Sequence, residues 1–302
     1  MSGGTVVLRA LGLGDLLTAV PALRAVRRGL PGPVVLAVPA DLTPLAMLTG
    51  AVDEVVDTAP LQPLDPRLSG AAVAVNLHGR GPQSTALLRA ARPGQLLAYD
   101  VPGGPAWDEA EHERARWCRL LTAYGIAADP DDLDVAPPPV EPVVRGAVLV
   151  HPGAAYASRR WPAQRWADVA RELVRRNGRV LVTGSAAEHD LAREVAHRAG
   201  LGDDDVLAGR TGLLELVALV AASRLVLCGD TGIAHVATAV GTPSVVLFGP
   251  ASPQRWRPPA ARTQHRVLWS GRTGEVFADR PDPGLLTLTC QDVLAASHDA
   301  LG

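Results

Sequence analysis

The chain has 302 residues, of which 47% are hydrophobic and 20% are charged, and its formal net charge at pH 7 is −2. This size and composition are typical of a soluble globular protein with two domains. A net charge so close to zero argues against nucleic acid or an anionic membrane as the main partner. We therefore expect no nucleic-acid binding and at most peripheral contact with a membrane.

The cysteines and the apolar runs bear on the compartment. Cys118, Cys228 and Cys290 are odd in number and far apart, which excludes close-spaced zinc or redox motifs and indicates reduced thiols. The N-terminus lacks the basic region and the cleavage site of a secretory signal, and no apolar run is long enough to span a bilayer. We therefore expect a cytoplasmic protein.

Apolar β-type runs alternate with helical patterns from the N-terminus onwards, as in a parallel sheet covered by helices. The pattern predicts strands at 5–9, 34–38, 73–76 and 96–99, and helices at 15–28, 42–48 and 107–124. Residues 127–146 then carry five prolines and several acidic residues. Such a stretch resists both helix and internal strand pairing, so it predicts a linker after a first domain at 1–126.

The alternation resumes after the linker. It predicts strands at 148–151, 180–183, 225–228 and 244–248, and helices at 163–176, 188–199, 213–222, 231–239 and 291–300. Residues 251–289 are rich in Pro, Arg and Gly and predict no element. The sequence thus indicates an α/β protein with a second doubly wound parallel-sheet domain at 147–302.

The first strand-to-helix turn contains Gly12, Gly14 and Asp15. It is a poor dinucleotide loop, because Leu17 occupies the position of the third glycine. Asp15 has two open interpretations. It caps the helix, or it is a functional carboxylate at the carboxyl edge of the first sheet.

The second half places polar residues just beyond three predicted strands. Arg159 and Arg160 follow the first, and paired guanidinium donors suit phosphate, although such a pair is also common at a solvated helix entrance. Ser185 and Glu188 follow the second, where a carboxylate either binds ribose hydroxyls or caps a helix.

The third strand leads into a helix through Asp230, Thr231 and Gly232, with His235 one turn further on. Free N–H groups at a helix start attract phosphate, and glycine lets a ligand approach the backbone. The alternative is that Asp230 only caps the helix.

Other chemistries find little support. The aspartates at 129–132 and 203–205 lie in loop-like segments without mixed ligands, which predicts solvated turns and no metal. The histidines show no metal-ligand spacing, and Ser185 lacks a G-x-S-x-G elbow, so zinc-enzyme and hydrolase interpretations are not favoured.

Five segments in chain order resemble glycosyltransferase family 9, the bacterial ADP-heptose heptosyltransferases: G-L-G-D at 12–15, H-P-G at 151–153, S-R-R-W-P at 158–162, T-G-S-A-A-E at 183–188 and D-T-G-I-A-H at 230–235. The resemblance covers most of the chain up to about residue 250. It implies a GT-B fold, in which two Rossmann-like doubly wound parallel-sheet lobes face a central cleft. It further implies that the first lobe binds mainly the acceptor and the second the nucleotide sugar, without a cofactor or metal.

The resemblance also implies roles for individual residues. Asp15 is the general base, with Arg9 and Gly14 on the acceptor side. Arg159 stands where the family usually has a phosphate-binding lysine, and Glu188 takes the ribose-contacting position. The other implied donor-binding residues are Gly153, Ser158, Ser185, Asp230, Thr231, Gly232 and His235. Ala155 replaces a Ser or Thr that is frequent in the family, so one hydroxyl contact to the donor phosphates is absent or comes from Ser158.

The implied activity is an inverting, metal-independent transfer of a sugar, heptose in this family, from a nucleotide-diphosphate sugar such as ADP-heptose to an acceptor hydroxyl. The acceptor is a glycan or a natural product. All 29 basic residues are arginine, which is typical of a GC-rich genome, and in a Gram-positive bacterium lipopolysaccharide core would be unavailable. Two alternatives stay open. A nucleotide-sugar 2-epimerase would need no acceptor, and an inactive nucleotide-sugar-binding protein would transfer nothing.

Overall fold

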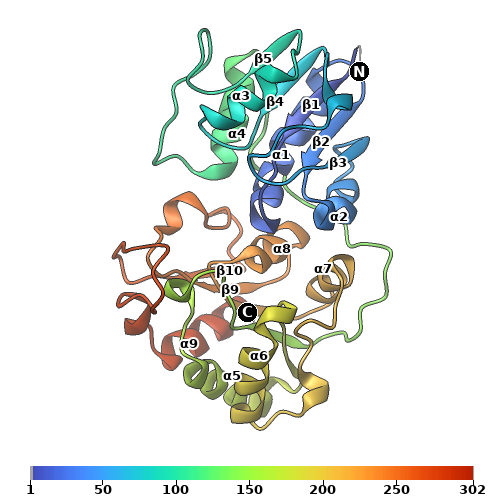
Figure 1. The fold of residues 1–302 in the computed structure, drawn as a ribbon. Coiled ribbons are helices and arrows are strands. Elements are labelled where there is room, and N and C mark those ends of the chain that lie inside the picture. Colours follow the sequence, from blue (N-terminus) through green and yellow to red (C-terminus); the bar gives the residue numbers. More distant parts are fainter. Residues whose placement is uncertain (1–2, 302) are drawn as a thin grey trace. The chain divides into compact units, whose positions relative to one another are not determined.

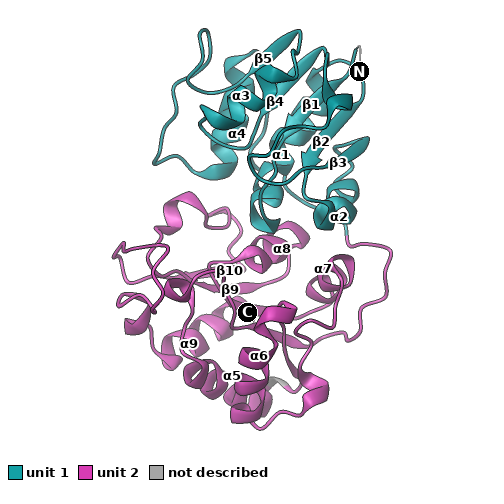
Figure 2. Cartoon of the chain, viewed as in Figure 1, with its two compact units in different colours: residues 1–136 teal, residues 137–302 magenta. Residues whose placement is uncertain are grey.

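The computed structural model describes residues 3–301, except for the side chain of Asn177. The chain divides into two compact units, residues 1–136 and 137–302 (Figure 2). The division falls inside the proline-rich stretch 127–146. The first part of that stretch is attached to unit 1, because the Asp132 carboxylate forms ion pairs with Arg24 at 2.7 Å and Arg28 at 2.8 Å.

Unit 1 is a five-stranded parallel sheet with the strand order β3-β2-β1-β4-β5 (Figure 1). Its strands are β1 (Thr5–Leu8), β2 (Val34–Val38), β3 (Glu54–Asp57), β4 (Val73–Asn76) and β5 (Gln95–Leu97). Its helices are α1 (Leu13–Gly29), α2 (Thr43–Leu48), α3 (Gln83–Ala90) and α4 (Glu113–Ala123), and α1 packs against α4.

Unit 2 repeats this architecture with the order β10-β9-β8-β6-β7, again all parallel. Its strands are β6 (Val148–His151), β7 (Val180–Val182), β8 (Leu225–Gly229), β9 (Ser244–Leu247) and β10 (His265–Leu268). Its helices are α5 (Ala163–Asn177), α6 (His189–Ala199), α7 (Leu213–Ala221), α8 (Gly232–Val240) and α9 (Cys290–Leu301). Within residues 3–301, no helix is both long and apolar enough to cross a bilayer.

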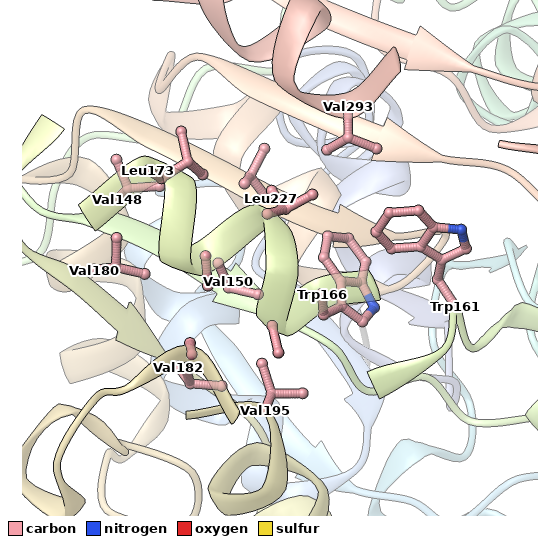
Figure 3. Packing of buried hydrophobic residues seen from close by; sticks show 14 of the residues in the cluster. Val148, Val150, Trp161, Trp166, Leu173, Val180, Val182, Val195, Leu227 and Val293 are labelled. Carbon is pink, nitrogen blue, oxygen red and sulfur yellow. The ribbon is translucent and has the colours of Figure 1, made fainter. Parts of the chain in front are cut away.

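Each unit has its own apolar core, which lies between the sheet and the helices that cover it. The central strands are apolar on both faces, and helices cover both faces of the sheet. In unit 2, Trp161 and Trp166 lie against each other with ring centroids 5.0 Å apart, and Val293 of α9 closes the cluster (Figure 3). Burial of two indole rings supplies a large apolar contribution to the stability of this unit.

Both units have a topological switch point, where the strand order reverses. In unit 1 the chain runs outward from β1 to β3 and then returns to β4 on the other side of β1. In unit 2 it runs from β6 to β7 and then returns to β8. Ligands of open α/β sheets bind at the carboxyl ends of the strands that flank such a point. The segments that follow β1, β4, β6 and β8 are therefore the places to examine.

The structure corrects several predicted elements. The helix predicted at 107–124 begins only at Glu113, because the Nδ1 atom of His112 accepts the N–H of Arg114 and Asp108 forms a local turn with Ala110. Residues 251–289, for which no element was predicted, contain β10. Strand β3 and helix α3 were not predicted at all. Strand β3 lies at an edge with one buried residue, and the buried face of α3 includes Ser84 and Thr85.

Candidate functional site

Asp15 lies in the first turn of α1, directly beyond the carboxyl end of β1. The N-cap residue is Gly12, and not Asp15 as the sequence had suggested, and the helix begins two residues earlier than predicted. Asp15 still contributes to the cap from the third helical position, because its Oδ2 atom accepts the N–H of Gly12 at 3.2 Å. Capping uses one oxygen only. The side chain keeps 30% of its surface exposed, which leaves the carboxylate able to meet a ligand. Gly14 lies beside it in the same turn and is half-buried.

Arg9 is completely buried and binds five groups through its guanidinium, one of which is the Thr18 hydroxyl at 3.2 Å from Nη2. Its Nε atom donates to the Asp15 carbonyl at 3.0 Å, and its Nη1 atom donates to the Leu77 carbonyl. Its Nη2 atom lies 3.4 Å from Asp15 Oδ1 and 3.3 Å from Glu113 Oε1. The sequence prediction put Arg9 on the acceptor side. With no exposed surface, Arg9 can influence a ligand only through the groups that it holds.

His78 is a candidate residue that the sequence reasoning missed. It follows β4, across the switch point from Asp15, and its N–H donates to the Asn76 side-chain oxygen at 3.1 Å. Its Nδ1 atom is buried and has no hydrogen-bond partner among residues 3–301. Burial lowers the pKa of His78 and the charge of Arg9 lowers it further, whereas Asp15 opposes both, so the ring is neutral at pH 7. Its place two residues beyond a predicted strand was the available signal.

In unit 2 the structure brings Gly153 and Glu188 together. Glu188 Oε2 accepts the Ser185 N–H and the Ser185 hydroxyl, both at 2.8 Å. A Cβ atom on Gly153 would lie 2.1 Å from Glu188 Oε1, far inside van der Waals contact. Only glycine at 153 therefore lets this carboxylate lie against the loop that follows β6.

The charge on Glu188 is held by its neighbours. Burial alone would raise the pKa of Glu188, but the two hydrogen bonds from Ser185 and the charge of Arg160 lower it. His151 is buried with Nδ1 3.0 Å from the Thr183 hydroxyl, and burial lowers its pKa despite Glu188. The half-buried Glu188 is therefore an ionised hydrogen-bond acceptor at neutral pH.

Arg159 and Asp230 face each other across the switch point of unit 2. Arg159 follows β6 and Asp230 follows β8, and Nη1 lies 3.7 Å from Oδ2. The Asp230 side chain is only 9% exposed, and burial raises its pKa while Arg159 opposes the rise. Arg159 is 24% exposed, and its Nε atom has no hydrogen-bond partner in the described part of the chain. Its guanidinium therefore has donors to spare for an anion.

The residues after Asp230 form the start of α8. Thr231 is the N-cap, and its side chain makes no capping hydrogen bond, so it leaves the first N–H groups of the helix unsatisfied by the cap. His235 lies one turn into α8, with its ring 6.0 Å from that of Trp256. Thr231, Gly232 and His235 are all partly exposed, as a ligand-binding role requires.

Ser158 has a different environment from the one that a donor contact needs. The residue is fully buried, and its hydroxyl donates to the Val276 carbonyl at 2.5 Å. Its backbone also bonds to Ala278 and Asp282. Ser158 thus anchors residues 276–282. Its single hydroxyl proton is donated to Val276, so it is not available for the contact to the donor phosphates that Ala155 cannot make.

Two carboxylates of the acidic clusters, Asp132 and Asp203, lie against basic side chains of the chain itself. Asp132 pairs with two arginines of α1, and Asp203 lies 2.8 Å from His197 Nε2 and 3.3 Å from Arg193 Nε. Among residues 3–301, no group of three or more His, Cys, Asp or Glu side chains is arranged to hold a metal ion.

Comparison with known proteins identifies relatives of this chain. The model of glycosyltransferase family 9 (heptosyltransferase) matches residues 94–276. Lipopolysaccharide heptosyltransferase 2 of Salmonella typhimurium is 32% identical over 160 residues, which cover 50% of this chain but only 45% of that relative. The chain thus spans less than half the length of this curated relative in the match.

Two solved structures show the fold over almost their whole length. The Escherichia coli ADP-heptose lipopolysaccharide heptosyltransferase II has a TM-score of 0.78 at 22% identity, covering 99% of this chain and 98% of that one. The glycosyltransferase family 9 structure from Veillonella parvula has a TM-score of 0.81 at 18% identity, covering 99% and 97%. This likeness confirms the predicted GT-B architecture of two parallel-sheet units.

Proposed function

Because the chain belongs to glycosyltransferase family 9, the heptosyltransferase family, we propose that it transfers a heptose from ADP-heptose to a hydroxyl of a glycan or natural product, with inversion and without a metal ion. The observation that carries the proposal is the pairing of Arg159 with buried Asp230 at the switch point of unit 2. This pairing leaves the partly exposed Arg159 guanidinium near the start of α8, where no side chain caps the helix. Guanidinium donors and free helix N–H groups together suit a diphosphate.

Unit 2 binds the nucleotide in this proposal. Arg159 and the N–H groups at the start of α8 hold the diphosphate, because planar guanidinium donors and a helix N-terminus both stabilise phosphate oxygens. The ionised Glu188 carboxylate accepts hydrogen bonds from the ribose hydroxyls. Asp230 orients Arg159, and the close contact at Gly153 keeps Glu188 in place.

Unit 1 supplies the base. A sugar hydroxyl is a weak nucleophile at neutral pH, so the exposed part of the Asp15 carboxylate takes its proton while the oxygen attacks the anomeric carbon. The bond to the diphosphate breaks, and Arg159 with the α8 N–H groups stabilises the charge that develops on ADP. A single displacement from the opposite side inverts the anomeric centre. One essential carboxylate suffices, because ADP leaves as a stabilised anion and needs no general acid to protonate it.

The test measures ADP release from ADP-heptose, with heptose-deficient lipopolysaccharide or water as acceptor, for the wild type and Asp15→Asn. We expect the variant to bind ADP normally in calorimetry and to release ADP roughly 10²–10⁴-fold more slowly, the usual effect of losing a general base. Near-normal turnover in Asp15→Asn would show that its carboxylate only caps α1.

The same assay is repeated in excess EDTA, where we expect the rate to persist. A loss of activity that added magnesium or manganese restores would contradict the metal-free mechanism. ADP-heptose that binds but yields no ADP with any acceptor would instead indicate a nucleotide-sugar-binding protein.

A further inference from the structure

A buried row of charges connects α4 to Asp15. Glu113, the first residue of α4, has a side chain only 7% exposed, and its Oε1 atom accepts from Arg9 Nη2 at 3.3 Å. The same oxygen accepts the Trp117 indole N–H at 3.0 Å, and Oε2 accepts from Arg116 Nη1. Arg9 in turn contacts Asp15 through its side chain and through its carbonyl.

Glu113 is the main reason that Arg9 can stay in this position. The side chains of Arg9 and Arg116 are both completely buried, and a buried guanidinium without a counter-ion is strongly destabilising. Asp15 cannot compensate Arg9 alone, because its side chain is 30% exposed and its carboxylate is partly solvated, whereas the Glu113 side chain is only 7% exposed. The Arg9 guanidinium also stacks on the Trp117 ring, 4.7 Å from its centroid, which fixes the plane in which it donates.

We propose that Glu113 is a positioning residue that acts through Arg9 on the Asp15 carboxylate; the proposal rests on the role of Asp15 as general base. Arg9 holds the Asp15 carbonyl through Nε and the carboxylate through Nη2, so it fixes the first turn of α1 and the direction of the side chain together. Because Glu113 shares the charge of Arg9, the guanidinium orients Asp15 without drawing it into a close ion pair. The carboxylate thus remains available to accept a proton.

The opposing interpretation is that Glu113 only stabilises α4. The experiment therefore compares Glu113→Gln with a matched control, Glu111→Gln. Glutamine keeps the shape of Glu113 and an acceptor for Trp117, but removes the charge that Arg9 needs. Glu111 undergoes the same chemical change two residues away, and its partner Arg119 belongs to a separate, bidentate ion pair.

We expect Glu113→Gln to lower kcat for ADP release about tenfold, a typical coupling between contacting groups, while Glu111→Gln stays within about twofold of wild type. The dissociation constant for ADP should be unchanged in both, because neither residue lies in unit 2. Equal kcat values for the two variants, or a loss that appears only in ADP binding, would overturn the proposal. If Glu113→Gln does not fold, Glu113→Asp keeps the charge, shortens the reach to Arg9 and serves in its place.

The second measurement introduces Glu113→Gln into Asp15→Asn. A positioning residue has nothing left to position in that background, so the double variant should have the kcat of Asp15→Asn. A purely structural role would lower kcat by the same factor in both backgrounds and would overturn the proposal.

The two failures can be told apart. Full activity in Asp15→Asn alone would refute the base assignment, whereas a slow Asp15→Asn with additive losses would refute only the role of Glu113. Where release by Asp15→Asn is below detection, the comparison with Glu111→Gln decides.

Discussion

Arg159 and Arg160 are adjacent in the chain, but their side chains have different partners. Arg159 faces Asp230 at 3.7 Å and keeps unused donors. Arg160 donates from Nε to the Ala154 carbonyl at 2.8 Å, and its charge helps to lower the pKa of Glu188. The first arginine is therefore arranged for a ligand, and the second for the loop that follows β6.

We predict that Arg159→Ala weakens ADP binding by about 1.5–3 kcal/mol, as expected for hydrogen bonds to a charged group. Arg160→Ala should have a much smaller effect, because it acts on the nucleotide only through Glu188. Isothermal calorimetry with ADP measures both. Equal losses, or a larger loss for Arg160→Ala, would show that the diphosphate is bound at the other arginine.

At the scale of elements, β10 depends on a neutral histidine. His265 lies opposite Ser244 of β9 in the sheet register, and its Nδ1 atom is 2.9 Å from the Ser244 hydroxyl. Burial, assisted by Arg262, lowers the pKa of His265 from 6.5 to about 4. Protonation is thus disfavoured in the folded state, and this edge strand should become less stable in acid.

The direction of this effect follows from proton binding. Below pH 6.5 the unfolded chain takes up a proton that the folded chain refuses until about pH 4, so stability is complete above pH 6.5 and falls as the pH drops towards 4. Between pH 7 and pH 4.5 we expect the free energy of unfolding of the wild type to fall by about 2.5 kcal/mol more than that of His265→Asn, which has no titrating group at position 265. Hydrogen exchange at the β10 amides, corrected for intrinsic rates, measures this difference. The same pH dependence in both proteins would contradict the assignment.

Each unit has its own sheet, helices and apolar core. The residues assigned to the nucleotide, from Gly153 to His235, all belong to unit 2, and α9 packs on β9, β10 and α5 of the same unit. Asp15, Arg9 and Glu113 all belong to unit 1. The proposed binding of the nucleotide and the proposed proton transfer are thus supported by separate cores.

We therefore predict that residues 137–302, produced alone, fold and bind ADP within about tenfold of the full chain, which is about 1.4 kcal/mol. Circular dichroism checks the fold and calorimetry checks the binding. A folded fragment that does not bind ADP would show that residues of unit 1 contribute to the nucleotide site.

The sequence by itself determined the α/β class, the two domains and most of the strands, although not β3, β10 or α3. It also placed the candidate site residues relative to the ends of the predicted strands. The apolar runs at 34–38, 73–76 and 148–151 coincide with β2, β4 and β6. Strands that are buried on both faces are continuously apolar, and this pattern is visible in the sequence. Parallel strands end at one edge, so residues just beyond strand ends could be grouped before any contact was known. The five ordered motifs also identified the family that the model match confirms.

Only the tertiary structure decided which of these residues touch each other and which are buried. Arg9 and Glu113 are 104 positions apart, and nothing in the local pattern of either residue indicates their ion pair. The same holds for the contact of Ser158 with Val276 and for the effect of the Arg9 charge on the pKa of His78. Periodicity is a property of neighbouring residues, whereas the burial of a charge and the choice of its partner depend on how distant segments pack, and this packing exists only in the folded chain.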